Sequence, residues 1–153
     1  MPNVPAALFD VNIWVALAFT THPYHGKAKR AFESANHQNP AVTCRAIQQS
    51  FLRLATTPAI QSCYGSETIT NAMAWDRWQF LLDFPQTLHL KEPPELEFQW
   101  RSYAQLDLPA PKRWMDSYLA AFARNYQIHL YTFDTDFLQF DGLQIRLLQN
   151  EPL

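Results

Sequence analysis

The sequence has little cysteine, and this shortage argues against two kinds of architecture. Its 153 residues include only Cys44 and Cys63, and neither forms a close pair with a cysteine or histidine at the spacing of metal ligands. A disulfide-stapled scaffold or a zinc site built on cysteine is therefore not expected. We expect two reduced, partly buried thiols.

Positive charge and long apolar runs are also scarce. Lys and Arg number 12 against 14 acidic residues, so the net charge of −2 gives no overall attraction to a polyanion. Binding one would need a local basic patch, for which Lys112 and Arg113 are better candidates than the segment 27–30, or a metal ion. The longest apolar stretches, such as 13–19, are far shorter than the roughly 20 residues of a membrane-spanning helix. The N-terminus has no basic region typical of a secretory signal, so we expect a cytoplasmic protein that does not bind a membrane.

The residues that are present are typical of a folded α/β domain. Apolar residues make up 48% of the chain and aromatic residues 14%, and the length suits one domain over residues 1–153. Short apolar runs alternate with longer amphipathic segments, which predicts a central parallel sheet of about five strands with helices on both faces. The expected strands are 6–10, 41–44, 86–90, 128–133 and 143–148, and the expected helices are 13–18, one from 24, 46–57, 66–84, 94–106 and one holding Asp116.

Three aspartates stand where such a fold brings strand ends together. Asp10 and Asp134 each follow an apolar strand, at the carboxyl edge where open parallel sheets bind ligands, and Asp116 is expected in the first turn of a helix. Taken alone, each is explained equally well as a turn former or a helix cap. Together they would repel one another unless a cation neutralised them, and oxygen-only ligation suits Mg²⁺ or Mn²⁺ better than zinc. The pattern therefore indicates a divalent metal site.

These segments also carry a resemblance to a known family. LFDVNIWVALAFTTHPYHGKAKRAF, RWMDSYLAAFAR and LYTFDTDF are similar to the first, a later and the last motif of PIN-domain proteins. Within that family the chain looks like the ribonuclease toxins of bacterial VapBC-type toxin–antitoxin pairs. The resemblance covers nearly the whole chain and implies a PIN-like three-layer fold.

The resemblance implies a metal-dependent endoribonuclease that cleaves single-stranded or looped RNA and inhibits growth. Mg²⁺ or Mn²⁺ would be held by Asp10, Asp116 and Asp134 and would promote hydrolysis of a phosphodiester. A cognate VapB-type antitoxin would silence the enzyme. A helical face rich in Phe, Trp and Leu would suit such a partner, and residues 67–84 or 24–35 are the first candidates for it. The family also implies a homodimer.

Four further residues are expected to support this site. Asn12 would orient Asp10 or a water molecule, and Thr132 and Asp136 would hold Asp134 or reach the metal through water. Gln48 marks a departure, because PIN ribonucleases usually carry an acid, commonly Glu, at the corresponding place. An amide oxygen can still bind a metal but removes one negative charge; an exposed helix residue is the alternative interpretation.

Other functions stay open at this stage. A PIN-like module that has lost efficient catalysis and acts by binding RNA or antitoxin is favoured by Gln48 alone, and a DNA-directed nuclease would use the same metal chemistry. A metal-free ribonuclease with His22 and His25 as acid and base is less favoured, because their spacing does not fix both rings on one helical face. Trp114 is the tryptophan best placed to stack on a nucleotide, although the core is its favoured position.

Overall fold

Five parallel strands form a single sheet, in agreement with the expected α/β fold. In this computed structural model, which describes residues 5–64 and 68–151, the spatial order of the strands is β3-β2-β1-β4-β5. Leu8 of β1 lies between Val42 of β2 and Leu130 of β4. The strands are β1 (Ala7–Phe9), β2 (Ala41–Thr43), β3 (Thr87–His89), β4 (His129–Thr132) and β5 (Ile145–Leu147). Each one falls within its expected range.

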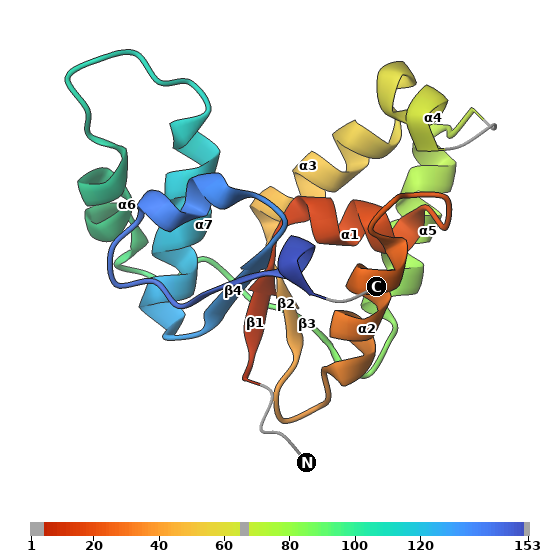
Figure 1. Ribbon diagram of the computed structural model, residues 1–153, viewed down its shortest axis with the longest axis horizontal. Coiled ribbons are helices and arrows are strands. Elements are labelled where there is room, and N and C mark those ends of the chain that lie inside the picture. The colour runs from red at the N-terminus through yellow and green to blue at the C-terminus, as the bar shows by residue number, and fades with distance from the viewer. Residues whose placement is uncertain (1–4, 65–67, 152–153) are drawn as a thin grey trace.

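Helices cover both faces of the sheet, so the three-layer arrangement is confirmed (Figure 1). Helices α6 and α7 pack along each other on one side, and α1 packs against α2 and α3 on the other. The helices are α1 (Val11–Ala18), α2 (His25–Ser34), α3 (Arg45–Ala55), α4 (Pro58–Tyr64), α5 (Asn71–Leu82), α6 (Leu96–Ala104) and α7 (Arg113–Tyr126), with 3₁₀ turns η1 (Thr135–Gln139) and η2 (Leu148–Asn150).

The sheet has its topological switch point between β1 and β4. From β1 the chain proceeds to β2 and β3 on one side, and it later returns to place β4 and β5 on the other. In Figure 1 the carboxyl ends of β1 and β4 point toward α1 and η1. Open α/β sheets bind ligands in the crevice at such a point. The segments that follow β1 and β4 are therefore the first place to look for a site.

Aromatic packing fixes α1 directly against the end of β1. The indole of Trp14 is fully buried, and its Nε1 donates a hydrogen bond to the carbonyl oxygen of Phe9 at 2.9 Å. The rings of Phe9 and Tyr131 stack with centroids 5.4 Å apart, and Trp14 meets Trp78 edge-on at 5.7 Å. Since these rings hold β1, β4 and α1 together, the turn between β1 and α1 has little freedom to move.

Some side chains are more exposed than the sequence suggested. The Trp114 side chain is 61% exposed, so its expected place in the core is wrong, and Trp75 is 52% exposed. Both thiols are free as expected; Cys44 is buried, whereas Cys63 is exposed rather than partly buried. The exposed indole of Trp114 lies near Asp116 in sequence and is therefore available to a ligand.

Two helix boundaries between β2 and β3 differ from the expected ones. The helix expected to reach residue 57 ends at Ala55, and Pro58 opens α4, because proline is well suited to the first position of a helix. The helix expected over 66–84 begins at Asn71, where the hydroxyl of Thr70 accepts the N–H of Met73 at 3.2 Å. Residues 66 and 67 lie outside the described residues. Of the helices in the described ranges, none combines the length and the apolar character needed to cross a membrane.

Helix α7 ends on a residue in the left-handed conformation, which allows a stability prediction. Gln127 has φ 56° and ψ 39°, and its N–H is bonded to the carbonyls of Ala123 and Arg124. A residue with a Cβ is strained there and glycine is not. We expect Gln127→Gly to stabilise the protein by roughly 0.5 to 1 kcal/mol, measured as a higher urea midpoint.

The opposite substitution at the neighbouring turn serves as its control. Gly142 also has a positive φ, 75°, and a Cβ added there would lie 2.9 Å from Cζ of Arg124. Gly142→Ala should therefore lower the urea midpoint. If Gln127→Gly lowered it as well, backbone strain at the end of α7 would not be the controlling factor.

Candidate metal centre

Asp10 lies at the junction of β1 and α1, with both carboxylate oxygens held. Its Oδ1 accepts the N–H of Val11 at 2.7 Å and so caps α1. Its Oδ2 accepts the hydroxyl of Thr132, at the end of β4, at 2.8 Å. The side chain is only 4% exposed. One bond is local and the other joins two strands that are distant in sequence, so the orientation of Asp10 depends on the assembled sheet.

Thr132 links the two strand ends that carry acids. Besides donating to Asp10, its hydroxyl oxygen accepts the backbone N–H of Asp134 at 3.0 Å. The Oδ1 of Asp134 in turn accepts the N–H of Asp136 at 2.8 Å, which caps η1. Asp10 and Asp134 therefore do serve as helix caps, as the simpler interpretation held. The same geometry also brings them to one edge of the sheet.

Asp116 enters from α7 and completes an acidic cluster. It lies in the first turn of that helix, as expected. One carboxylate oxygen from each of Asp116, Asp134 and Asp136 can be chosen so that all lie within 4.8 Å of one another. Asp116 and Asp134 are half-buried and Asp136 is exposed. From the sequence we expected Asp136 to have only a supporting role. The close spacing of the two acids in FDTDF was a signal that Asp136 could be a metal ligand itself.

Burial makes ionisation of Asp10 costly. Desolvation raises its pKa from 3.8 to about 6, even though the hydrogen bonds from Thr132 and Val11 act in the other direction. The charges of Asp116 and Asp134 raise the pKa further. Asp10 is thus coupled electrostatically to two of the clustered acids, and it was expected to bind the metal together with them.

The pKa of Asp116 is raised to about 6 as well, first by desolvation and then by Asp134 and Asp136. The charge of Lys112 partly offsets this effect. Within the described ranges, the ion pairs are Lys29–Glu33 and Arg146–Glu151, and neither involves these acids. A cluster of hard oxygen ligands whose negative charge is so poorly compensated fits Mg²⁺ or Mn²⁺.

Gln48 is buried, and the alternative of an exposed helix residue is wrong. It lies near the start of α3, is 5% exposed, and its Oε1 accepts a hydrogen bond from the Arg45 guanidinium. Asn12, in contrast, is exposed on α1, and the hydrogen bonds that hold Asp10 come from Val11 and Thr132. Roles for Asn12 and Gln48 at the metal stay predictions.

The two basic residues next to Asp116 differ in their contacts. Nε of Arg113 donates to the carbonyl of Tyr103 at 2.8 Å, and its Nη1 donates to Gln139, so the guanidinium anchors α7 to its surroundings. Lys112 is exposed at the N-terminal end of α7. Of the pair, Lys112 is the residue available to a phosphate.

The two histidines of the metal-free alternative are engaged by backbone groups. Nδ1 of His25 lies 2.7 Å from the carbonyl oxygen of Ala16, and Nδ1 of His22 accepts the N–H of Tyr24 at 3.0 Å. These bonds use one nitrogen of each ring to hold the segment between α1 and α2. The arrangement favours a structural role over acid–base catalysis.

The parallel sheet and the acids at its switch point are what the resemblance to PIN-domain proteins implied, and sequence comparison agrees. The family model described as the PIN domain matches residues 7–143. The chain therefore belongs to the PIN-domain family. It is 44% identical over 142 residues to Ribonuclease VapC41 of Mycobacterium tuberculosis, in strains CDC 1551 / Oshkosh and H37Rv, covering 92% of this chain and 97% of the relative. The resemblance to VapC-type PIN-domain toxins is confirmed.

Solved structures show the same fold. VapBC2 of Rickettsia felis, bound to a DNA fragment from its promoter, matches with a TM-score of 0.62 at 11% identity, over 92% of this chain and 97% of that one. VapC20 of Mycobacterium tuberculosis, a toxin that cleaves the sarcin–ricin loop, matches with a TM-score of 0.63 at 19% identity, over 87% and 93%. At these identities the likeness concerns the fold alone.

Proposed function

We propose that this protein is a metal-dependent endoribonuclease toxin of a type II toxin–antitoxin system, which hydrolyses RNA phosphodiester bonds with Mg²⁺ or Mn²⁺. The observation that supports the proposal is the cluster of Asp116, Asp134 and Asp136 at the carboxyl edge of the sheet, with buried Asp10 coupled electrostatically to Asp116 and Asp134. The 44% identity to a ribonuclease over 92% of the chain supports RNA as the substrate.

The acids have distinct parts in the proposed reaction. Asp116 and Asp134 would hold the cation, with Asp136 at the exposed rim of the cluster and Asp10, coupled to both by charge, in the buried interior. The chemistry that such a cation would supply there is activation of a water molecule and neutralisation of the charge that develops on the phosphate during hydrolysis. Thr132 keeps Asp10 in place through its hydroxyl. The cation would also offset the charge of these acids, which would otherwise repel the negatively charged strand.

The proposal is tested by incubating the purified protein, freed of antitoxin, with a mixed RNA pool and with DNA strands of matched sequence. We expect RNA to be cut in Mg²⁺ or Mn²⁺ and to stay intact in EDTA, because without a cation nothing would activate the attacking water or offset the charge of the clustered acids. The measurement is the appearance of fragments on a denaturing gel. Cutting that persists in EDTA would contradict the metal mechanism, and preferential cutting of DNA would contradict the substrate.

A second candidate is a PIN-like module that binds RNA or antitoxin with weakened catalysis. It is favoured by Gln48, a neutral residue where the family usually has an acid, whose amide oxygen is already bonded to Arg45. A folded wild-type protein that binds RNA but does not cut it in either metal would select this function.

The proposed system includes a VapB-type antitoxin and a homodimer. Of the two expected docking regions, α5 is the better candidate, since Trp75 and Phe80 are exposed on it and a groove of about 290 Å³ runs beside Trp75. Residue 67 of the expected range lies outside the described residues.

A size measurement of the purified chain should give twice the monomer mass. The proposal places the whole chain, residues 1–153, in the cytoplasm as one PIN-like domain.

A further inference from the structure

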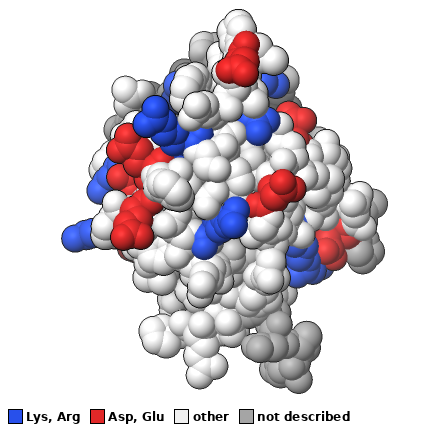
Figure 2. Space-filling model, turned by 90° about the vertical axis from the view of Figure 1, so that its left-hand side faces the viewer, with Lys and Arg blue, Asp and Glu red and all other residues white. Residues whose placement is uncertain are grey.

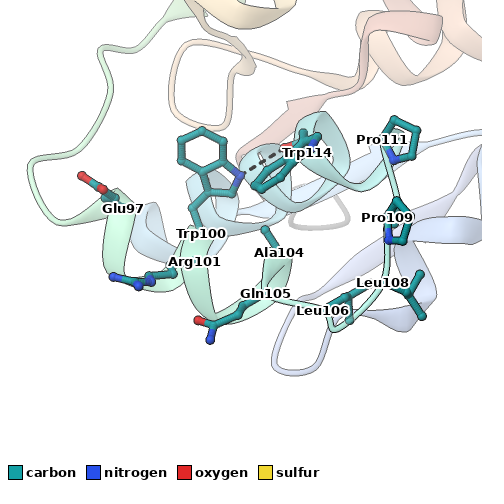
Figure 3. Close-up of a pocket in the computed structure, with 11 residues that line it drawn as sticks. Glu97, Trp100, Arg101, Ala104, Gln105, Leu106, Leu108, Pro109, Pro111 and Trp114 are labelled. Atoms are coloured by element: carbon teal, nitrogen blue, oxygen red, sulfur yellow. Dashed lines mark hydrogen bonds between the residues drawn. The ribbon is translucent and has the colours of Figure 1, made fainter.

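A hollow lies beside the first turn of α7, the turn that also carries Asp116. It is a pocket of about 730 Å³ between α6, the start of α7 and the segment that joins them. Figure 3 shows two tryptophans on the helices and a row of apolar residues on the joining segment around it. The apolar lining residues are Trp100, Trp114, Leu106, Leu108, Pro109 and Pro111.

The two tryptophans form a fixed corner. Nε1 of Trp100 is 3.1 Å from both the carbonyl oxygen of Trp114 and the hydroxyl of Ser117, so its indole is tied to α7. The rings meet edge to face, with centroids 6.4 Å apart. Because Trp114 is 61% exposed, its ring can receive a flat partner without rearrangement. Such a preformed aromatic surface is suited to stacking with a base.

Polar side chains border the apolar walls. Glu97, Arg101 and Gln105 line the pocket and are exposed, so they offer hydrogen-bond donors and acceptors at its rim. Flat apolar surfaces combined with a few polar groups match a nucleobase, which has a π face and a hydrogen-bonding edge. Figure 2, which faces this side of the molecule, shows charges of both signs scattered over a largely uncharged surface. A ligand here would be recognised by stacking more than by a broad basic patch.

The position of the pocket relates it to the acidic cluster. Trp114 and Asp116 are two residues apart in the first turn of α7, so their side chains leave the helix in nearly opposite directions. The pocket and the acids thus flank the N-terminal end of α7. Exposed Lys112 lies at this helix end, where its charge and the helix dipole favour a phosphate. A single strand crossing this helix end would reach both sites.

We infer that the Trp100–Trp114 pocket binds an unpaired nucleobase of the RNA substrate, close to the phosphate that is cut. The inference rests on the proposed function, because it takes the occupant to belong to the same RNA strand. Stacking on Trp114 makes this residue a determinant of where the strand is cleaved. Trp114 acts in binding and positions the strand, whereas Asp116 acts in the chemistry.

The test is a double-mutant cycle on binding. Short single-stranded RNAs, each with one abasic position, are titrated by fluorescence anisotropy in Mg²⁺ against proteins carrying Asp116→Asn. Trp114→Ala should weaken binding of the intact RNA about tenfold, while Trp114→Phe, which keeps an aromatic face, should lose much less. At one position of the RNA, removal of the base should weaken binding to the protein that keeps Trp114. The same removal should not weaken binding to the Trp114→Ala protein any further. Phe98→Ala is the matched control, since this α6 side chain is 84% exposed and lies outside the pocket.

The outcomes separate this inference from the proposed function. Unchanged RNA binding by Trp114→Ala, or equal losses for Trp114→Ala and Phe98→Ala, would overturn the inference even if the wild type cuts RNA. Coupling between Trp114 and one base would support it even if the wild type cuts nothing. If Trp114→Ala instead converted a dimer to a monomer without affecting RNA binding, the pocket would be a contact between copies of the chain, and the inference would fail.

Discussion

Asp116→Asn is expected to reduce RNA cleavage by about a thousand-fold or more and to leave the fold intact. The carboxylate of Asp116 shares the cluster with Asp134 and Asp136, and the amide that replaces it carries no charge for a cation. Loss of one ligand that acts mainly on transition-state charge is worth several kcal/mol, and about 4 kcal/mol corresponds to a factor of a thousand. The measurement is the initial rate of RNA cleavage in Mg²⁺, with growth on expression as a second readout.

The control for this substitution is Asp83→Asn. Asp83 is an exposed acid that caps the end of α5, shortly before β3 begins and so at the opposite edge of the sheet from the cluster. The Asp83→Asn substitution removes the same charge from the chain as Asp116→Asn does, and it should leave RNA cleavage unchanged. If Asp116→Asn cut RNA at a rate close to that of the wild type, the acidic cluster would not be the catalytic site.

The second large effect concerns stability and its dependence on pH. In EDTA, Asp10→Asn should be more stable than the wild type by about 2 kcal/mol near neutral pH. The folded-state pKa of Asp10 is about 6 against 3.8, a difference of about two units that corresponds to about 3 kcal/mol. The variant also loses the carboxylate that accepts the Thr132 hydroxyl, which lowers this gain in the free energy of unfolding by about 1 kcal/mol.

The sign of this effect reverses in acid. A raised pKa means that the folded protein binds a proton more tightly than the unfolded chain, so the wild type is stabilised below pH 4 and loses that stability as the pH rises through 6. Asp10→Asn has no such dependence at this position, and the two curves of unfolding free energy against pH should cross. Asp116, whose pKa is raised in the same direction, adds a slope that both proteins share.

Urea unfolding at several pH values from about 4 to 8 measures the effect, with Asp83→Asn as control. Mg²⁺ should raise the stability of the wild type at neutral pH more than that of Asp10→Asn, because a ligand that binds only the folded state adds to its stability. Parallel curves for the wild type and Asp10→Asn would mean that burial of this carboxylate is not costly.

The sequence by itself determined the elements and the chemistry of this protein. Short apolar runs between longer amphipathic segments placed all five strands, and an acid at the end of an apolar run was enough to locate Asp10 and Asp134 at the carboxyl edge of a parallel sheet. These features are local, since strand and helix patterns depend on the spacing of neighbouring side chains. The motifs added the family, which the comparisons confirm.

Only the tertiary structure decided which side chains meet and which are exposed. Asp136 lies in the cluster, and the Thr132 hydroxyl reaches Asp10 across 122 positions of sequence, because β4 lies beside β1. Trp114 was expected in the core, yet α6 packs along α7 so that its indole faces an open pocket. Gln48 of α3 is buried because of how the helices pack in the folded chain. Burial depends on how helices pack after the chain has folded, and residue type and spacing do not determine it.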